Sequence, residues 1–130
     1  MKDLKFTLLY FALILGGIFI LIFITTSSWI GFDVKEKCHL AKEKYGQEKC
    51  IDNLLAFIDD PNNNLKEKNN YIWALGQLGD KKALPILQQY YTGAECDHAK
   101  FLCQYELKKA INLLNNGANI TAFVWRYNID

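Results

Sequence analysis

The sequence has no excess of charge of either sign. Its 130 residues include 15 lysine and arginine residues and 14 aspartate and glutamate residues, for a formal net charge of +1. Nucleic-acid-binding domains usually present a strongly basic face, so this balance predicts no nucleic-acid partner. The sequence contains no strand-like alternation and no glycine-rich phosphate loop, which excludes the common nucleotide-binding motifs. Its length allows one small domain rather than two.

The cysteines and histidines lack the spacings that mark metal and redox sites. No CxxC, HxxxH or HExxH motif occurs, and a zinc site usually contains one. A thiol oxidoreductase would need CxxC, and a c-type haem would need CxxCH. The pairs Cys38 with His39 and Cys96 with His98 keep a metal or redox protein as a minor alternative. We predict no cofactor, no metal and no catalytic residue, and therefore a non-enzymatic protein.

One long apolar run stands out from the otherwise ordinary composition. Residues 6–24 contain no charge, and as a helix these 19 residues would rise about 28 Å, close to the hydrocarbon thickness of about 30 Å. Fourteen of them are Leu, Ile or Phe, each of which favours insertion. The run therefore predicts a single-pass transmembrane helix over residues 6–26 that contacts the lipid bilayer.

The charges beside this run predict its orientation. Lys2, Lys5 and the terminal amine precede it, whereas uncharged residues follow it, so residues 1–5 should stay in the cytoplasm. The rest of the chain would then be periplasmic or extracellular. A cleaved signal peptide is the alternative, with Thr26 and Ser28 as small residues before the cleavage site. The run exceeds the usual apolar length of about 7–15 residues in signal peptides, which favours an uncleaved signal anchor.

Helical periodicity dominates the exported part. We expect a juxtamembrane linker over 27–32, with Trp29 and Phe32 near the membrane interface, and a helical domain over 33–117. Its five predicted helices cover residues 33–45, 47–59, 64–78, 81–91 and 97–116. Their short connections predict antiparallel hairpins. Residues 118–130 should form an extended aromatic tail packed on the helices.

A repeat-like pattern occupies residues 68–91. The residues that carry it are Lys68, Trp73-Ala74-Leu75-Gly76, Leu78-Gly79-Asp80, Ala83-Leu84-Pro85 and Leu87. This stretch resembles the HEAT-like repeat of phycobilisome-lyase-type proteins, although Tyr71 replaces the usual alanine. The resemblance implies an all-α fold, in which the transmembrane helix leads into a short HEAT-like solenoid of αα-hairpins with about five helices.

Individual residues of the pattern have clear physical roles. Ala74 and Gly76 are small where two helices should approach closely, and Gly79 permits a left-handed turn. Asp80 can accept hydrogen bonds from the first free amides of the next helix. Pro85, placed inside the predicted helix 81–91, should remove one backbone hydrogen bond and bend that helix.

Four cysteines in an exported domain predict disulfide bonds at Cys38, Cys50, Cys96 and Cys103. Three pairings are possible, and sequence proximity favours Cys38–Cys50 and Cys96–Cys103. An unbroken helix from residue 97 would hold Cys96 and Cys103 about 10 Å apart, so local pairing requires a later helix start. Pairing of Cys38 with Cys50 requires a late start or a tilt of the first helix.

Two functions fit these features. The resemblance implies a membrane-tethered protein–protein interaction module with an unidentified protein partner, for which Asp52, Gln88 and Gln89 are candidate contacts. The alternative is a small accessory subunit of a larger membrane complex. In that case the small residues Ala12 and Gly16 would seat another transmembrane helix.

Overall fold

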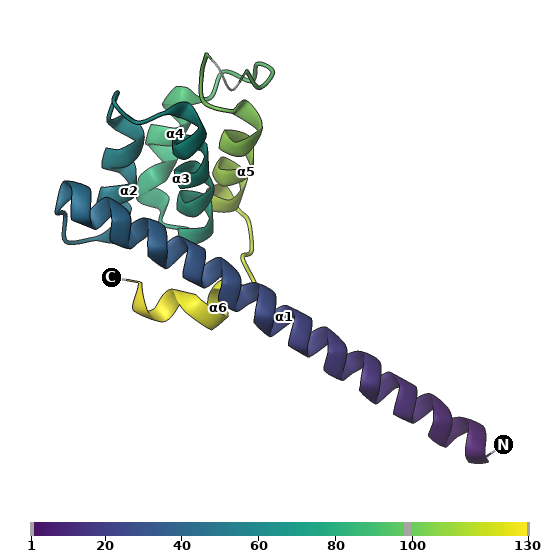
Figure 1. Ribbon diagram of the computed structural model, residues 1–130. Coiled ribbons are helices and arrows are strands. Elements are labelled where there is room, and N and C mark those ends of the chain that lie inside the picture. Colours follow the sequence, from purple (N-terminus) through teal and green to yellow (C-terminus); the bar gives the residue numbers. More distant parts are fainter. Residues whose placement is uncertain (1, 98–99, 130) are drawn as a thin grey trace.

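The computed structural model describes residues 2–97 and 100–129, and all regular structure within them is helical. The all-α class is therefore confirmed. His98 and Ala99 lie outside the described residues. The elements, shown in Figure 1, are α1 (Lys2–Tyr45), α2 (Cys50–Asp59), α3 (Leu65–Leu78), η1 (Lys81–Ala83), α4 (Leu84–Tyr90), α5 (Gln104–Asn115), α6 (Ala122–Trp125) and η2 (Arg126–Asn128), where η marks a 3₁₀ turn.

The first helix is much longer than predicted. Residues 27–32, expected as a linker, are helical, and α1 continues without a break to Tyr45. The sequence has no proline here, and the Thr25 hydroxyl donates to the Leu21 carbonyl 2.8 Å away, inside the helix. Asp33, expected to begin a new helix, instead forms an i,i+4 ion pair with Lys37 at 2.5 Å.

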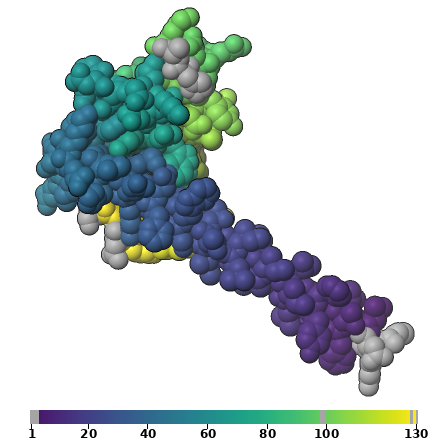
Figure 2. All heavy atoms as spheres, in the orientation of Figure 1, coloured from purple at the N-terminus to yellow at the C-terminus, as the bar shows by residue number. Residues whose placement is uncertain are grey.

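The first part of α1 projects from the rest of the molecule as a free rod (Figures 1 and 2). Most large apolar side chains from Leu4 to Ile24 are at least 48% exposed. By length and composition, this helix is apolar enough to cross a membrane. From Val34 onward the same helix has a buried face, formed by Val34, Cys38 and Ala41.

The helices after α1 stack as antiparallel hairpins around one core. The last part of α1 packs on α2, α2 packs on α3, and α3 packs on α5, which also contacts α4. Leu54, Ile72, Leu75, Leu87 and Leu107 have no exposed surface. The predicted close approach occurs at Gly76, where a Cβ atom would lie 2.9 Å from the Ala110 Cα.

The repeat turn between α3 and α4 confirms two predictions and corrects one. Gly79 has the left-handed φ of +72°, and the Asp80 carboxylate accepts from the Lys82 amide at 2.9 Å. Pro85, however, lies in the first turn of α4, because η1 precedes that helix. A proline there removes no helical hydrogen bond, so the predicted bend has no cause.

Two helices begin later than predicted, and the tail is not extended. Helix α2 begins at Cys50 rather than at residue 47, and α5 begins at Gln104 rather than at residue 97. The tail turns back beneath α1 as α6 and η2 (Figure 1). Trp125 is 6% exposed and lies against Gly31, where any Cβ atom would clash with its side chain.

Candidate interaction surface

The structure brings Cys38 and Cys50 to disulfide distance. Their Cα atoms are 5.0 Å apart, although α1 neither starts late nor breaks. The late start of α2 makes this possible, because Gly46 turns the chain with a φ of +68° and Lys49 is extended. Cys50 is therefore the first residue of its helix rather than the fourth.

A buried asparagine holds this turn. Asn53 has no exposed surface, and its amide donates to the carbonyls of Gln47 and Lys49, both at 3.0 Å. Its side-chain oxygen accepts from the Gln47 amide at 2.9 Å. Asn53 was not singled out in the sequence, where a lone asparagine among apolar residues gives no signal that distinguishes a buried network from a surface position.

Cys96 and Cys103 also lie at disulfide distance, with Cα atoms 4.7 Å apart. The condition stated from the sequence is met, since α5 starts after Cys103. Gln104, 4% exposed, fixes the loop between α4 and α5. Its side chain accepts from the Thr92 amide at 2.7 Å and donates to the Leu102 carbonyl at 3.0 Å.

The histidine positions add little to the metal alternative. His39 is exposed, and its ring nitrogen lies 3.7 Å from the Glu43 carboxylate. His98 is outside the described residues. Within the described part of the chain, no three His, Cys, Asp or Glu side chains form a group that could hold a metal ion.

The predicted contacts Asp52, Gln88 and Gln89 lie on α2 and α4. Asp52 pairs with Lys82 of η1, and the Tyr90 hydroxyl at the end of α4 donates to the Asp59 carboxylate of α2 at 2.8 Å. Gln88 and Gln89 are exposed. We call this surface the α2–α4 face; one polar contact links α2 to η1 and one links α2 to α4.

A second surface follows α3, in two hollows that we call the α3 groove. The first, of about 450 Å³, lies between α1 and α3. Asp33, Glu36 and Glu67 make it acidic, with Lys37 as its cation. Tyr71 forms part of its wall, stacked on Phe57 with ring centroids 3.6 Å apart. Burial, aided by Glu67, raises the pKa of the Tyr71 hydroxyl.

The second hollow of the α3 groove, of about 350 Å³, lies between α3 and α5. It carries the cations Lys66 and Lys109 and the single carboxylate of Glu106. Asn70 lines both hollows and is exposed. Trp73, partly buried, links them further, because the Lys37 ammonium lies 5.5 Å from the centre of its ring.

A polar network closes the end of α1 against the connection from α2 to α3. The Tyr45 hydroxyl donates to Asp60 at 2.7 Å and accepts from Asn63 at 2.8 Å, while Lys44 lies 3.1 Å from the Asp60 carboxylate. The Tyr45 hydroxyl, the Asn62 amide and Lys44 together hold the pKa of Asp60 well below its usual range. This network fixes the last turn of α1 to the repeat.

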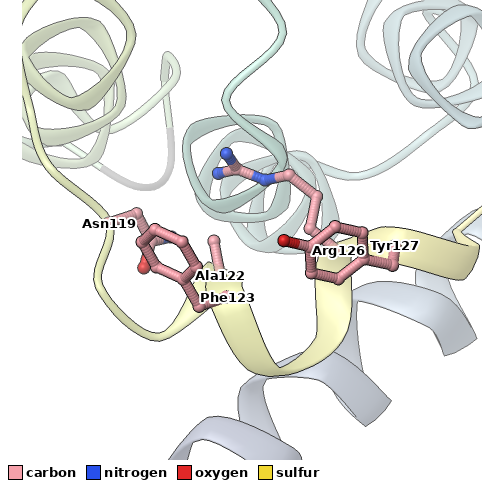
Figure 3. Close-up of a pocket in the computed structure, with 5 residues that line it drawn as sticks. All are labelled: Asn119, Ala122, Phe123, Arg126 and Tyr127. Carbon is pink, nitrogen blue, oxygen red and sulfur yellow. The ribbon is translucent and has the colours of Figure 1, made fainter.

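A third hollow, of about 350 Å³, is formed by the tail alone (Figure 3). Phe123 and Tyr127 stand on its two sides, and Arg126 extends between them toward the end of α3. There the Arg126 guanidinium donates to the Gln77 carbonyl at 2.7 Å. Both aromatic side chains are more than 75% exposed.

Comparison with known proteins supports the repeat. Residues 72–92, which cover the second half of α3 and all of η1 and α4, match the family model described as the PBS lyase HEAT-like repeat. A search of curated proteins and a search of solved structures found no match. The chain thus contains a HEAT-like helical repeat within an all-helical fold, and such repeats are typical of protein-interaction modules.

Proposed function

We propose that this protein is a membrane-tethered interaction module that binds a protein partner through the α3 groove. The observation that carries the proposal is Trp73, which lines the basic hollow, is partly buried, and has its ring centre 5.5 Å from the ammonium of Lys37 in the acidic hollow. Aromatic residues set among polar neighbours dominate many protein–protein interfaces. The α2–α4 face also carries an aromatic side chain, Tyr90, but its hydroxyl is already bound to the Asp59 carboxylate at 2.8 Å.

The tether in this proposal is the exposed first part of α1. Its apolar side chains pack on nothing in the described structure, and a bilayer is the solvent that suits them. The positive residues at its start support a cytoplasmic N-terminus. The two cysteine pairs at disulfide distance support an oxidising, extracytoplasmic location for the repeat domain.

The charge pattern of the α3 groove specifies the partner's chemistry. The hollow beside α1 contains three carboxylates and one ammonium, whereas the hollow beside α5 contains two ammonium groups and one carboxylate. A complementary partner segment therefore has basic residues at one end and acidic residues at the other. An aromatic or aliphatic side chain between them would cover Trp73. This is a binding role, and we expect no catalysis.

Site-specific photocrosslinking in intact membranes tests the proposal. A photoreactive amino acid at Asn70 should give a discrete crosslinked product, whereas the same amino acid at Gln89 on the α2–α4 face should not. Both positions are exposed, so neither variant should disturb folding. Reversing Lys66 and Lys109 to glutamate should abolish the product, and Lys49→Glu, an exposed control, should leave it unchanged.

Other outcomes would favour a different function. Equal products from positions 70 and 89 would contradict a specific groove. Replacing residues 6–26 with an unrelated apolar span should leave the product from position 70 intact. If it is lost while the chain still inserts, the accessory-subunit alternative gains support. Gly16, where an added Cβ atom would meet no other atom within 4 Å, is then the place to search for a helix partner.

A further inference from the structure

The aromatic side chains near the middle of α1 and in the tail lie at one level of the molecule. Trp29 and Phe32 on α1 are 75% and 74% exposed, and Phe123 and Tyr127 in the tail are 77% and 79% exposed. The tail is tied to this level because Trp125 lies against Gly31. We call these four exposed residues the aromatic collar.

The aromatic collar surrounds a large part of α1. Successive helical residues are rotated by about 100°, so Phe32 lies about 100° and Trp29 about 160° around the helix from Gly31. The tail occupies the side at Gly31, and a hollow lined by Ser28, Phe32, Lys35 and Tyr127 joins it to α1. Exposed aromatic rings thus extend from the tail around roughly half of the helix.

The height of the collar coincides with a membrane surface. Trp29 follows Ile24 by about 7.5 Å of helix rise. The headgroup layer on each side of the hydrocarbon is about 5–7 Å thick, so the backbone of Trp29 lies at its outer edge and that of Phe32, about 12 Å beyond Ile24, lies outside it. Side chains of a helix lean toward its N-terminus, which brings both rings closer to this layer. Tyrosine and tryptophan are enriched at this depth because their rings are apolar and their polar atoms contact water and headgroups.

The tail is held on α1 by apolar contact. Ala122 and Trp125 are buried against the rest of the molecule, yet the Trp125 indole N–H and the Ser27 hydroxyl have no hydrogen-bond partner among the described residues. The outward-facing residues of the same segment include Ile120 and Val124, 63% and 43% exposed. A tail that served only to cap α1 would not need apolar residues on its outer side.

We propose that the tail is a second membrane contact, which places the aromatic collar in the headgroup layer of the bilayer. The proposal rests on the proposed tether, since α1 brings the tail to this depth. Lys35, which is exposed and lies beside the collar, supplies a cation that favours anionic headgroups. With two contacts instead of one, the repeat domain is held at a fixed angle to the membrane.

Fluorescence quenching by brominated lipids in vesicles of the full-length protein tests this contact. Three variants each carry Trp29→Phe and one new tryptophan: Tyr10→Trp in the span, Phe123→Trp in the collar, or Leu40→Trp as a control further along α1. All three positions are at least 49% exposed, so the substitutions leave the core intact. Trp73 and Trp125 contribute the same background to each variant.

The expected result separates the two proposals. Lipids brominated near the carbonyl end of their acyl chains should remove more than half of the added fluorescence at position 123 and little at position 40. Lipids brominated at the methyl end should quench position 10 most. If position 10 is quenched but positions 123 and 40 are quenched equally weakly, the second contact is overturned. The same conclusion holds if aqueous quenchers also fail to reach position 123, because protein rather than lipid then shields it. Absence of quenching at position 10 overturns the tether itself.

Discussion

The two parts of α1 share one helical backbone and differ in what surrounds them. Large side chains of the first part, such as Leu13 and Phe19, are 64% and 71% exposed, whereas Val34 and Ala41 near the other end have no exposed surface. The first part is apolar on all sides. The last part is apolar only toward α2 and α3, and charged elsewhere.

This difference shows how one helix can have one part suited to lipid and another part suited to a water-exposed domain. A helix that is apolar all round suits lipid, and a helix with one apolar stripe suits a water-exposed domain. Because no break separates the two parts, the domain is joined to the proposed membrane span by a stiff helix rather than by a flexible linker. The angle between them is therefore set by α1 and by whatever contacts it, including the tail.

The largest expected effect comes from the core of the domain. Leu75→Ala should lower the free energy of unfolding by about 2–5 kcal/mol, because it leaves a cavity at a side chain with no exposed surface. The control Leu15→Ala, in the exposed part of α1, should change it by less than about 0.5 kcal/mol. Denaturation in detergent followed by near-ultraviolet circular dichroism measures both, and equal losses would contradict the division of α1 into two parts.

A charge in the first part of α1 should oppose insertion. Ile14→Lys should cost about 3 kcal/mol of insertion free energy, since lysine at the centre of a span is strongly disfavoured. Carbonate extraction should then release a large fraction of the protein from membranes. Leu40→Lys is the matched control at an exposed position of the same helix, and it should stay membrane-bound. Full retention of both variants would show that residue 14 does not lie in lipid.

The cysteine pairs sharpen the comparison, because Cys38 ties only the second part of α1 to the domain. Non-reducing peptide mapping should recover Cys38 linked to Cys50 and Cys96 linked to Cys103. Replacing either pair by serine should cost about 2.5–3 kcal/mol of stability on the loop-closure scale, slightly more for the pair with 12 residues of separation than for the pair with 7. Four free thiols in protein purified from membranes would refute the bonds.

The smallest effect concerns the last turn of α1 and depends on pH. The pKa of Asp60 is lowered in the folded protein, first by the Tyr45 hydroxyl, so this carboxylate stabilises the fold above its unfolded pKa of about 4. That contribution is lost as the pH falls from about 4 through the lower folded pKa. Between about pH 5 and pH 2 the wild type should lose more stability than Asp60→Asn.

The denaturation midpoint at a series of pH values measures this difference. Glu48→Gln, a change at an exposed carboxylate of the neighbouring turn, is the control and should follow the wild-type profile. Superimposable profiles for the wild type and Asp60→Asn would show that the network does not contribute to stability.

Sequence periodicity predicted most of the helices, because the stripes that bury Ile51, Leu54 and Ile58 recur at helical spacing. The repeat residues Gly79 and Asp80 were assigned their correct roles, since each has a local physical requirement. Helix starts were predicted poorly. Residues 47–49 have helix-compatible composition, but the Asn53 side chain bonds the backbone of Gln47 and Lys49 in the turn before α2. Before α5, the Gln104 side chain bonds the backbone of Thr92 and Leu102.

The candidate interaction surface was not predictable from the sequence. Lys37, Asn70 and Trp73 come from two helices separated by a third, and only packing makes their hollows adjacent. Gln88 and Gln89, candidate contacts from the sequence, are exposed, but the pattern could not show that Asp52 pairs with Lys82.

The sequence by itself determined the all-helical class, the apolar segment and the repeat turn, because each depends on residues within a few positions of one another. Tertiary contacts decided that the tail folds back onto Gly31. They also decided that the α3 groove joins two hollows of different charge. These features depend on contacts between distant segments, whose free energy no local pattern of residues records.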